Sequence, residues 1–282
     1  MRTRFAPSPT GPLHLGHAYS ALLIGDMVRD AGGTLLLRIE DTDTGRCKPE
    51  FETAIYEDLK WLGLNWQEPV WRQSSRLAEY DITLNQLIDA GFCYPCSCTR
   101  KDIRDALSAP QEGQKTATDG PVYPGTCRHR HIDTRGENDA IRLDIAKVLK
   151  RHPGIVGLTF NETGPNFTGS HPLTTDWLLN QIGDIVLARR DINTASYHLS
   201  VVVDDAAQGI TDIIRGEDLF ESTYIHRLLQ ALLDLPTPTY HHHRLIRDED
   251  GKRLAKRDDA RAIHTYRDKG LSVTDIRKLV GL

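Results

Sequence analysis

The sequence predicts an α/β fold with a parallel sheet, and the first 40 residues carry the main observations. Residues 2–6 have the composition of a short strand, and apolar side chains recur at helical spacing from residue 13 to 29. The run TLLLRIE at 34–40 is apolar until it ends in charge, as a buried parallel strand would be. Strand, helix and strand in this order form one βαβ unit, which predicts a Rossmann-like architecture.

The later elements are predicted from the same periodicities. We expect residues 50–90 to form helices, including 51–64 and 76–91, and a further helical pattern covers 221–234. Strand patterns occupy four: 140–145, 197–205, 210–216 and a strand from 241 that precedes a turn at Asp250-Gly251. Two short helices are expected to finish the chain. Residues 91–135 differ from all of these, because they combine four of the five cysteines with several glycines and prolines and little periodicity. We expect an inserted subdomain there, organised by something other than a core.

Composition limits the classes of function. The chain has 282 residues, 39% of them apolar, and a net charge of −4, so a nucleic-acid partner would require a local basic patch. No apolar stretch approaches the roughly 20 residues that cross a bilayer. The N-terminus lacks the apolar segment of a signal peptide, so we expect a cytoplasmic protein that does not contact membranes. Five cysteines in a reducing compartment indicate metal binding or chemistry rather than disulfides.

The stretch TGPLHLGH resembles the start of a phosphate-binding loop. Gly11 and Gly16 bracket four residues, but His17 and Ala18 stand where such a loop has lysine and a hydroxyl residue. His14 and His17 lie three residues apart at the start of the predicted helix, so they share a face at its positive end. Their N–H groups could bind ATP phosphates, and Gly16 would let a purine lie against the backbone. Spacing alone fits structural histidines equally well.

A longer match favours the functional interpretation. RFAPSPTGPLHLGH, residues 4–17, resembles the first signature of class I aminoacyl-tRNA synthetases, in the form of the glutamate and glutamine branch. The resemblance implies that His14 and His17 are catalytic and, with Gly16, bind ATP. In that family the histidines stabilise the α-phosphate while the amino-acid carboxylate attacks it. Catalysis there depends on positioning and electrostatic stabilisation, without a protein nucleophile.

The family's second signature is a mobile basic loop. GKRLAKRDD at 251–259 lies where it is expected, and the resemblance gives Lys256 a catalytic and ATP-binding role on the triphosphate. Arg253 and Ala255 depart from the family pattern; Arg253 keeps the charge, and a lost neutral hydrogen bond costs about 0.5–1.5 kcal/mol. Without the first signature, a solvated basic loop would be the simpler interpretation.

A glutamate pocket needs cations at one end and an acid at the other. Arg4 and Arg215 fall at the ends of predicted strands, where such sheets bind ligands, and the fork of an arginine can bond both carboxylate oxygens. Glu40 closes its strand and could accept the ammonium, while Tyr197 begins the predicted strand 197–205. Structural ion pairs are the alternative. The resemblance implies this glutamate-binding set: Arg4, Ala6, Ser8, Glu40, Tyr197 and Arg215.

The clustered cysteines indicate one structural zinc ion. Spacing alone would select four thiolates: Cys93, Cys96, Cys98 and Cys127. The segments CSCTR and YPGTC resemble instead the zinc site of short glutamyl-tRNA synthetase paralogues, which implies the ligands Cys96, Cys98, Tyr123 and Cys127. His129 and His131 are spare donors, and free buried cysteines are the alternative. The same segment offers a local RNA contact through Arg100, Lys101, Arg104, Arg128, Arg130 and Arg135.

The segment after the basic loop is short, so we expect no separate anticodon-binding region. From Arg4 to about residue 280 the chain is similar to the glutamyl-queuosine tRNA(Asp) synthetase family. That resemblance implies ATP and Mg²⁺ as co-substrates and activation of glutamate without tRNA. It also implies transfer to queuosine at the wobble position of tRNA(Asp), by a monomer. An anticodon-loop base is unstacked enough to enter a pocket.

The resemblance also implies a division into four segments. They are the first half of the catalytic domain at 1–90, the zinc-binding insertion at 91–135, an acceptor-binding insertion with the second catalytic half at 136–240, and the basic loop with short helices at 241–282. Three other functions stay open: a trimmed synthetase charging the 3′ end of tRNA(Glu), a nucleotidyltransferase acting on a small alcohol, and a catalytically silent tRNA-binding paralogue.

Overall fold

The structure, a computed structural model, describes residues 1–108, 116–117, 120–190, 194–246 and 262–282. The N-terminal segment forms the first part of the catalytic sheet, three parallel strands in the order β1-β2-β3. The strands and their crossover helices are β1 (Arg2–Phe5), α1 (Leu15–Asp30), β2 (Thr34–Ile39), α2 (Pro49–Trp61) and β3 (Gln67–Arg72). The predicted βαβ unit is confirmed. The prediction of helices throughout 50–90 is wrong at β3, whose residues QEPVWR are half-buried or exposed and so lack the apolar pattern of a buried strand.

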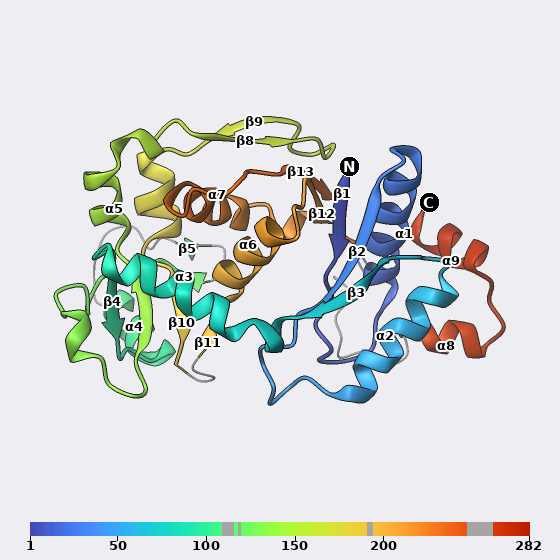
Figure 1. The fold of residues 1–282 in the computed structure, drawn as a ribbon, viewed down its shortest axis with the longest axis horizontal. Coiled ribbons are helices and arrows are strands. Elements are labelled where there is room, and N and C mark those ends of the chain that lie inside the picture. Colours follow the sequence, from blue (N-terminus) through green and yellow to red (C-terminus); the bar gives the residue numbers. More distant parts are fainter. Residues whose placement is uncertain (109–115, 118–119, 191–193, 247–261) are drawn as a thin grey trace.

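The second half of the sheet continues beside the first (Figure 1). Its strands are β12 (Asp212–Gly216), β13 (Thr239–His243), β8 (Thr159–Glu162) and β9 (Gly169–Pro172), in that spatial order. The first three are parallel, and β9 is antiparallel to β8. The amide of Thr211 donates to the carbonyl of Arg2 over 2.9 Å, so β12 begins next to the start of β1. The carboxyl ends of β1, β2, β12 and β13 therefore lie along one edge.

One sequence prediction is wrong here. Residues 197–205 form the first part of helix α6 (Tyr197–Ala207), not a strand. Its valines favour a strand by only a few tenths of a kcal/mol each. Nearly every side is buried, and α6 packs between α3 (Leu77–Asp89) and α7 (Ser222–Leu232). A helix buried all round shows no helical polar stripe, which removes the signal that periodicity would supply.

The insertion forms an antiparallel sheet on the other side of the molecule (Figure 1). Its order is β11-β10-β7-β4, from β4 (Cys93–Cys96), β7 (Ala140–Leu143), β10 (Val186–Arg189) and β11 (Thr194–Ala195). Its other elements are α4 (Arg100–Ser108), β5 (Thr116–Ala117), β6 (Gly120–Pro121), α5 (Ile145–Arg151) and a π-helix, η4 (Trp177–Ile182). Because β4 pairs with β7, the sheet crosses the predicted segment boundary at residue 135.

The last elements return to the first half of the sheet. They are α8 (Ile263–Asp268) and α9 (Val273–Val280), the two short helices expected at the end of the chain. Arg277 on α9 makes two 2.8 Å bonds to Asp26 on α1. Short 3-10 turns complete the described elements: η1 (Gln73–Arg76), η2 (Ile132–Thr134), η3 (Pro153–Ile155) and η5 (Glu217–Leu219). None of the helices in the described ranges has the length and apolarity needed to span a membrane.

Two cores stabilise the sheet from opposite faces. Alternate residues of β2 divide between them: Leu35 and Leu37 join a core with α1, α2, α8 and α9, while Leu36 joins one with α3, α5, α6 and α7. This is the two-residue alternation of a strand buried on both faces. The carboxyl edge of the strands, between these cores, carries the polar side chains.

Candidate active site at the carboxyl edge of the sheet

The side chains of His14 and His17 accept hydrogen bonds from backbone amides and so cap the N-terminus of helix α1. His14 is the N-cap: its Nδ1 accepts from the amide of Gly16 over 3.1 Å, and Nδ1 of His17 accepts from the amide of His14 over 3.1 Å. The ring centroids lie 3.9 Å apart. Because each Nδ1 accepts, each neutral ring carries its proton on Nε2. The pair thus presents N–H donors at the positive end of a helix, the arrangement that binds anions.

Gly16 allows the His14 ring to fold back over the helix. A Cβ at this position would lie 2.9 Å from Cε1 of His14 and 3.1 Å from its Nδ1. Any side chain would therefore push the imidazole off its cap. This contact is a structural reason for the glycine, and the purine contact expected from the sequence stays a prediction.

The predicted basic loop, with Lys256, Arg253 and Ala255, lies outside the described residues. The chain is described again from Ala262, which forms a β-bridge with His14. The amide of Ile263 donates to the carbonyl of Leu13 over 2.8 Å. The residue that follows the loop is thus anchored directly at the first signature.

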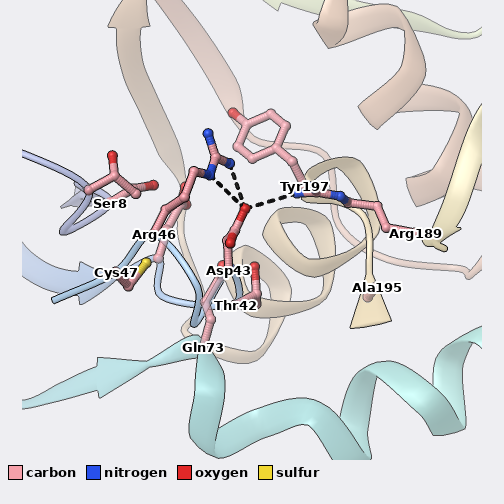
Figure 2. Close-up of a pocket in the computed structure, with 11 residues that line it drawn as sticks. Ser8, Thr42, Asp43, Arg46, Cys47, Gln73, Arg189, Ala195 and Tyr197 are labelled. Carbon is pink, nitrogen blue, oxygen red and sulfur yellow. Dashed lines mark hydrogen bonds and ion pairs between the residues drawn. The ribbon is translucent and has the colours of Figure 1, made fainter. Parts of the chain in front are cut away.

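A cavity of about 140 Å³ opens at the same edge (Figure 2). It is lined by Ser8, Thr10, Glu40, Thr42, Asp43, Arg46, Cys47, Gln73, Arg189, Ala195 and Tyr197. Three members of the predicted glutamate set, Ser8, Glu40 and Tyr197, are among them. Ala6 follows β1 and is half-buried. Tyr197 begins α6 rather than a strand. Burial raises the pKa of its hydroxyl and the charge of Glu40 adds to the rise, while Arg215 and Arg4 oppose it.

Arg4 is buried on β1 and already has a carboxylate partner. Its Nε and Nη2 donate to the two oxygens of Asp205 over 2.8 and 3.3 Å. Burial would raise the pKa of Asp205, but Arg4 and Arg38 lower it, so the carboxylate stays ionised. The Nε and Nη2 side of Arg4 is therefore engaged by Asp205, and the contact with glutamate expected from the sequence stays a prediction.

Arg38 completes this buried ion network, and periodicity alone did not identify it. It is fully buried, donates to Asp205 over 2.8 Å and to Glu40 over 3.4 Å, and lies 3.8 Å from Asp204. Burial lowers the arginine's pKa, but the three carboxylates outweigh it and raise the value. Asp204 also binds Gln73, Arg76 and Tyr80. The sequence signal for Arg38 was a charged residue within the apolar run LLLRIE.

Glu40 bridges the network and the cavity. It is half-buried after β2, and its Oε1 accepts from Arg38. Burial raises its pKa, while Arg38 and Arg4 oppose the rise. A buried carboxylate of this kind is stabilised by an added cation such as an ammonium group.

Arg215 is buried at the end of β12 and has no carboxylate partner within the described residues. Its Nε donates to Nε2 of His242 over 3.0 Å, and its Nη2 donates to Oγ1 of Thr223 over 2.8 Å and to the carbonyl of Leu219 over 3.2 Å. Nη1 lies 3.2 Å from Nδ1 of His226 and 3.5 Å from the hydroxyl of Tyr197. Its charge is surrounded by neutral groups.

An ion cluster crosses the mouth of the cavity. Asp43 binds Arg46 over 2.7 Å and lies 3.7 Å from Arg189 of β10 (Figure 2). It links the loop after β2 with the sheet of the insertion. Sequence reasoning missed this cluster: Asp43 and Arg46 are three residues apart, but Arg189 comes from a remote segment.

The cysteine-rich segment gathers four candidate ligand atoms. The thiols of Cys96, Cys98 and Cys127 lie within 4.8 Å of one another and could hold a metal ion. The hydroxyl of Tyr123 lies 3.4 Å from Sγ of Cys96 and 3.5 Å from Sγ of Cys98, and Sγ of Cys98 lies 3.6 Å from Sγ of Cys127. Burial would raise the pKa of Cys127, but hydrogen bonds from Tyr123 and neighbours lower it to about 6. Burial, by contrast, raises the pKa of Cys98 to about 11, so the lowered value belongs to Cys127.

Cys93 lies apart from this group. It begins β4, packs against the larger core rather than against the other three thiols, and burial raises its pKa to about 12. An inert thiol of this kind is structural. Two of the predicted RNA-contacting arginines are engaged within the chain: Arg128 binds Asp184, and Arg130 binds Asp139, each over 2.8 Å.

Residues 1–281 match the family described as tRNA synthetases class I (E and Q), catalytic domain. The chain belongs to this family. It is accordingly a ligase of the class I aminoacyl-tRNA synthetase type, and the fold class expected from the sequence is confirmed.

Individual relatives refine the comparison. Glutamyl-Q tRNA(Asp) synthetase from Rhodobacter capsulatus is 54% identical over 282 residues, which cover 100% of both chains. The protein of the same name from Albidiferax ferrireducens is 42% identical over 93% of this chain and 86% of its own. A glutamate tRNA ligase from Elizabethkingia meningosepticum, solved with its amino acid, superposes with a TM-score of 0.69 at 28% identity. That match covers 92% of this chain and 52% of the solved one, so this chain spans about half of that ligase.

Proposed function

We propose that the protein activates glutamate with ATP, without tRNA, and transfers it to the queuosine at the wobble position of tRNA(Asp). The observation that carries the proposal is a convergence at one sheet edge. Two histidine N–H donors at a helix N-terminus lie at the same edge as the half-buried carboxylate of Glu40 and the buried Arg215, which has no carboxylate partner among the described residues. A phosphate, an ammonium and a carboxylate each find a complementary group there.

Each group has a defined part in adenylate formation. His14 and His17 donate to ATP phosphates and stabilise the charge that develops on the α-phosphate. Gly16 belongs to this ATP site, and Lys256, outside the described residues, has the triphosphate role that the resemblance implies. Ala262, the first described residue after that segment, pairs with His14. Mg²⁺ accompanies ATP. No protein nucleophile is required, because the substrate's own α-carboxylate attacks.

The glutamate occupies the cavity beside Tyr197. Glu40 receives its ammonium, and Arg215 with the Tyr197 hydroxyl receives the carboxylate that does not react. Ala6 and Ser8 shape the wall after β1. Arg4 contributes its charge and its hold on Asp205 rather than a free fork.

We further propose that one structural zinc ion is held by Cys96, Cys98, Cys127 and Tyr123. Around a tetrahedral zinc, sulfur–sulfur edges measure roughly 3.8 Å and sulfur–oxygen edges roughly 3.5 Å. The atoms of this group lie 3.6 Å apart for one sulfur pair and 3.4 and 3.5 Å apart for the two sulfur–oxygen pairs. Zinc would cross-link a segment that has only a small core.

The acceptor is proposed from the relatives. Several carry the printed name Glutamyl-Q tRNA(Asp) synthetase, including the one that matches this chain over its full length. We infer a monomer in the cytoplasm whose single partner RNA presents an unstacked anticodon base. One relative, from Aquifex aeolicus, is named Glutamate--tRNA ligase, so charging of tRNA(Glu) is an outcome that the test must separate.

The test is transfer of labelled glutamate. The protein is incubated with ATP, labelled glutamate and tRNA(Asp) bearing either queuosine or guanosine at the wobble position, with tRNA(Glu) in parallel. We expect label on the queuosine-bearing tRNA alone, stable after removal of the tRNA 3′ end. Label on tRNA(Glu) would indicate a conventional synthetase activity, and no label with no pyrophosphate exchange would indicate a silent paralogue.

A further inference from the structure

Arg215 lies at the centre of a buried polar chain that the active-site chemistry does not account for. On one side are His242 and Glu162, from β13 and β8; on the other are His226 and His198, from α7 and α6. All four are at most 8% exposed. Burying this many polar side chains is unfavourable unless every donor and acceptor is matched.

The donor pattern of Arg215 determines where the imidazole protons lie. A guanidinium has five N–H donors and no acceptor, so any atom that bonds it must carry a lone pair. Nε2 of His242, 3.0 Å from Nε, and Nδ1 of His226, 3.2 Å from Nη1, must therefore both lack a proton. Thr223 and a carbonyl occupy Nη2.

Glu162 fixes the tautomer of His242. With Nε2 bare, the proton of His242 lies on Nδ1, which is 2.5 Å from Oε2 of Glu162. The other oxygen, Oε1, accepts from the amides of His242 and Gly164 over 2.8 and 2.6 Å. Gly164 is needed for this closure, since a Cβ there would lie 2.2 Å from the carbonyl of His242. Glu162 is thus held in one orientation.

On the other side of Arg215, His198 fixes the tautomer of His226. Nε2 of His226 lies 3.2 Å from Nδ1 of His198, so the proton of His226 is donated there and its Nδ1 is left to accept from Arg215. Burial, and then the charge of Arg215, lowers the pKa of His226 well below its ordinary value. The ring stays neutral.

Only one direction of Arg215 is weakly held. Its Nη1 reaches the hydroxyl of Tyr197 over 3.5 Å, the longest of its bonds, and this tyrosine lines the cavity (Figure 2). We propose that Glu162, His242, His226 and His198 are positioning residues that aim this single Nη1 edge, with the Tyr197 hydroxyl, at the substrate's non-reacting carboxylate. The proposal rests on the proposed function, and it makes carboxylate recognition one-edged rather than bidentate.

Glu162→Gln tests the chain with almost no change of shape. Oε1 must remain an acceptor for two amides, so the new amide nitrogen takes the place of Oε2 and donates to Nδ1 of His242. His242 then carries its proton on Nε2, so this N–H faces the Nε–H of Arg215 and neither group can accept. We expect KM for glutamate to rise roughly tenfold to a hundredfold, the effect of one charged hydrogen bond, with KM for ATP within about twofold. Glu52→Gln, in a pair between half-buried Glu52 and exposed Arg72 on the first sheet, is the matched control.

A substrate-free readout separates this inference from the proposed function. Histidine ¹⁵N spectra of the free protein should show one ring, absent in His242→Gln, in the Nδ1–H form, and Glu162→Gln should convert it to Nε2–H. Wild-type protein that does not activate glutamate would defeat the proposed function. An active wild type whose Glu162→Gln variant keeps both its tautomer and its glutamate KM would overturn the inference.

A second pair covers the case in which Glu162→Gln fails to fold. His226→Asn keeps an acceptor near the Nδ1 position, whereas His226→Leu removes it. We expect the Leu variant to raise KM for glutamate at least fivefold more than the Asn variant, at equal KM for ATP. Equal glutamate KM values in the two would contradict the positioning role.

Discussion

Arg4 and Arg215 both approach the substrate edge from parallel strands, and their surroundings differ in charge. Arg4 shares Asp205 with Arg38, so two buried guanidinium groups meet a carboxylate directly. Arg215 meets histidines, a threonine and a carbonyl, and the carboxylate of Glu162 reaches it only through His242. A buried charge without a partner is unfavourable until an anion arrives. This difference favours a structural role for Arg4 and is the basis of the ligand role that we propose for Arg215.

The largest expected effect follows from removing the uncompensated cation. Arg215→Ala should lower kcat/KM for glutamate on the order of a thousandfold, because the substrate carboxylate then enters a buried site with no cation. ATP should bind as before. Glutamate-dependent pyrophosphate exchange and ATP titration measure the two effects, and Arg215→Met controls for lost volume. Undiminished glutamate activation would remove Arg215 from the site.

Removing the carboxylate that Arg4 and Arg38 share should lower stability. Asp205→Asn leaves Arg4 and Arg38 buried with one charge fewer, which costs about 3–5 kcal/mol of unfolding free energy. Urea unfolding measures the loss. A variant as stable as the wild type would show that the two arginines are not compensated by Asp205, and the contrast with Arg215 would disappear.

The position of His242 beside Arg215 also predicts that stability depends on pH. Burial, with the charge of Arg215, lowers the pKa of His242 from an ordinary value of 6.5 to about 4, although Glu162 opposes this. The unfolded chain then binds a proton more readily than the folded one, so stability present above pH 6.5 is lost as pH falls towards 4. The loss should be roughly 3 kcal/mol. Urea unfolding between these pH values should show it, and His242→Gln should show a smaller decline. Equal declines would assign the effect to other groups.

The smallest effect concerns the insertion, away from both arginines. Tyr123→Phe removes one proposed zinc ligand, so metal affinity should fall by at least the roughly tenfold that outer-shell changes produce. Cys93→Ser, outside the group, should keep the metal. Competition with a chelator, followed by mass spectrometry of the native protein, compares the two. Loss of zinc from the Cys93 variant alone would restore the four-cysteine site.

The sequence predicted the elements that are amphipathic or are bounded by turn-forming residues. The βαβ unit over β1, α1 and β2 and the final two helices had clear periodicity, and the structure confirms them. Helix α6 was mistaken for a strand because burial on all sides removed its polar stripe. Strand β3 was missed because its residues are largely exposed. Tertiary packing determined both elements.

The site was predictable where a motif is contiguous. His14, Gly16 and His17 fall within one stretch, and the three metal-competent cysteines fall within two. The partners that give Arg4 and Arg215 different roles come from remote segments: Asp205 is 201 residues from Arg4, and Glu162 is 80 residues from His242. No spacing rule links such positions, because only the assembled sheet brings them into contact.

The most direct measurement is pyrophosphate exchange without tRNA, comparing glutamate with glutamine. An arginine whose charge no described carboxylate balances requires an anion, so exchange should be at least roughly a hundredfold faster with glutamate at limiting concentration. Glutamine has the same shape but leaves Arg215 unpaired. Equal exchange with the two amino acids would contradict the claim that an uncompensated Arg215 selects the substrate.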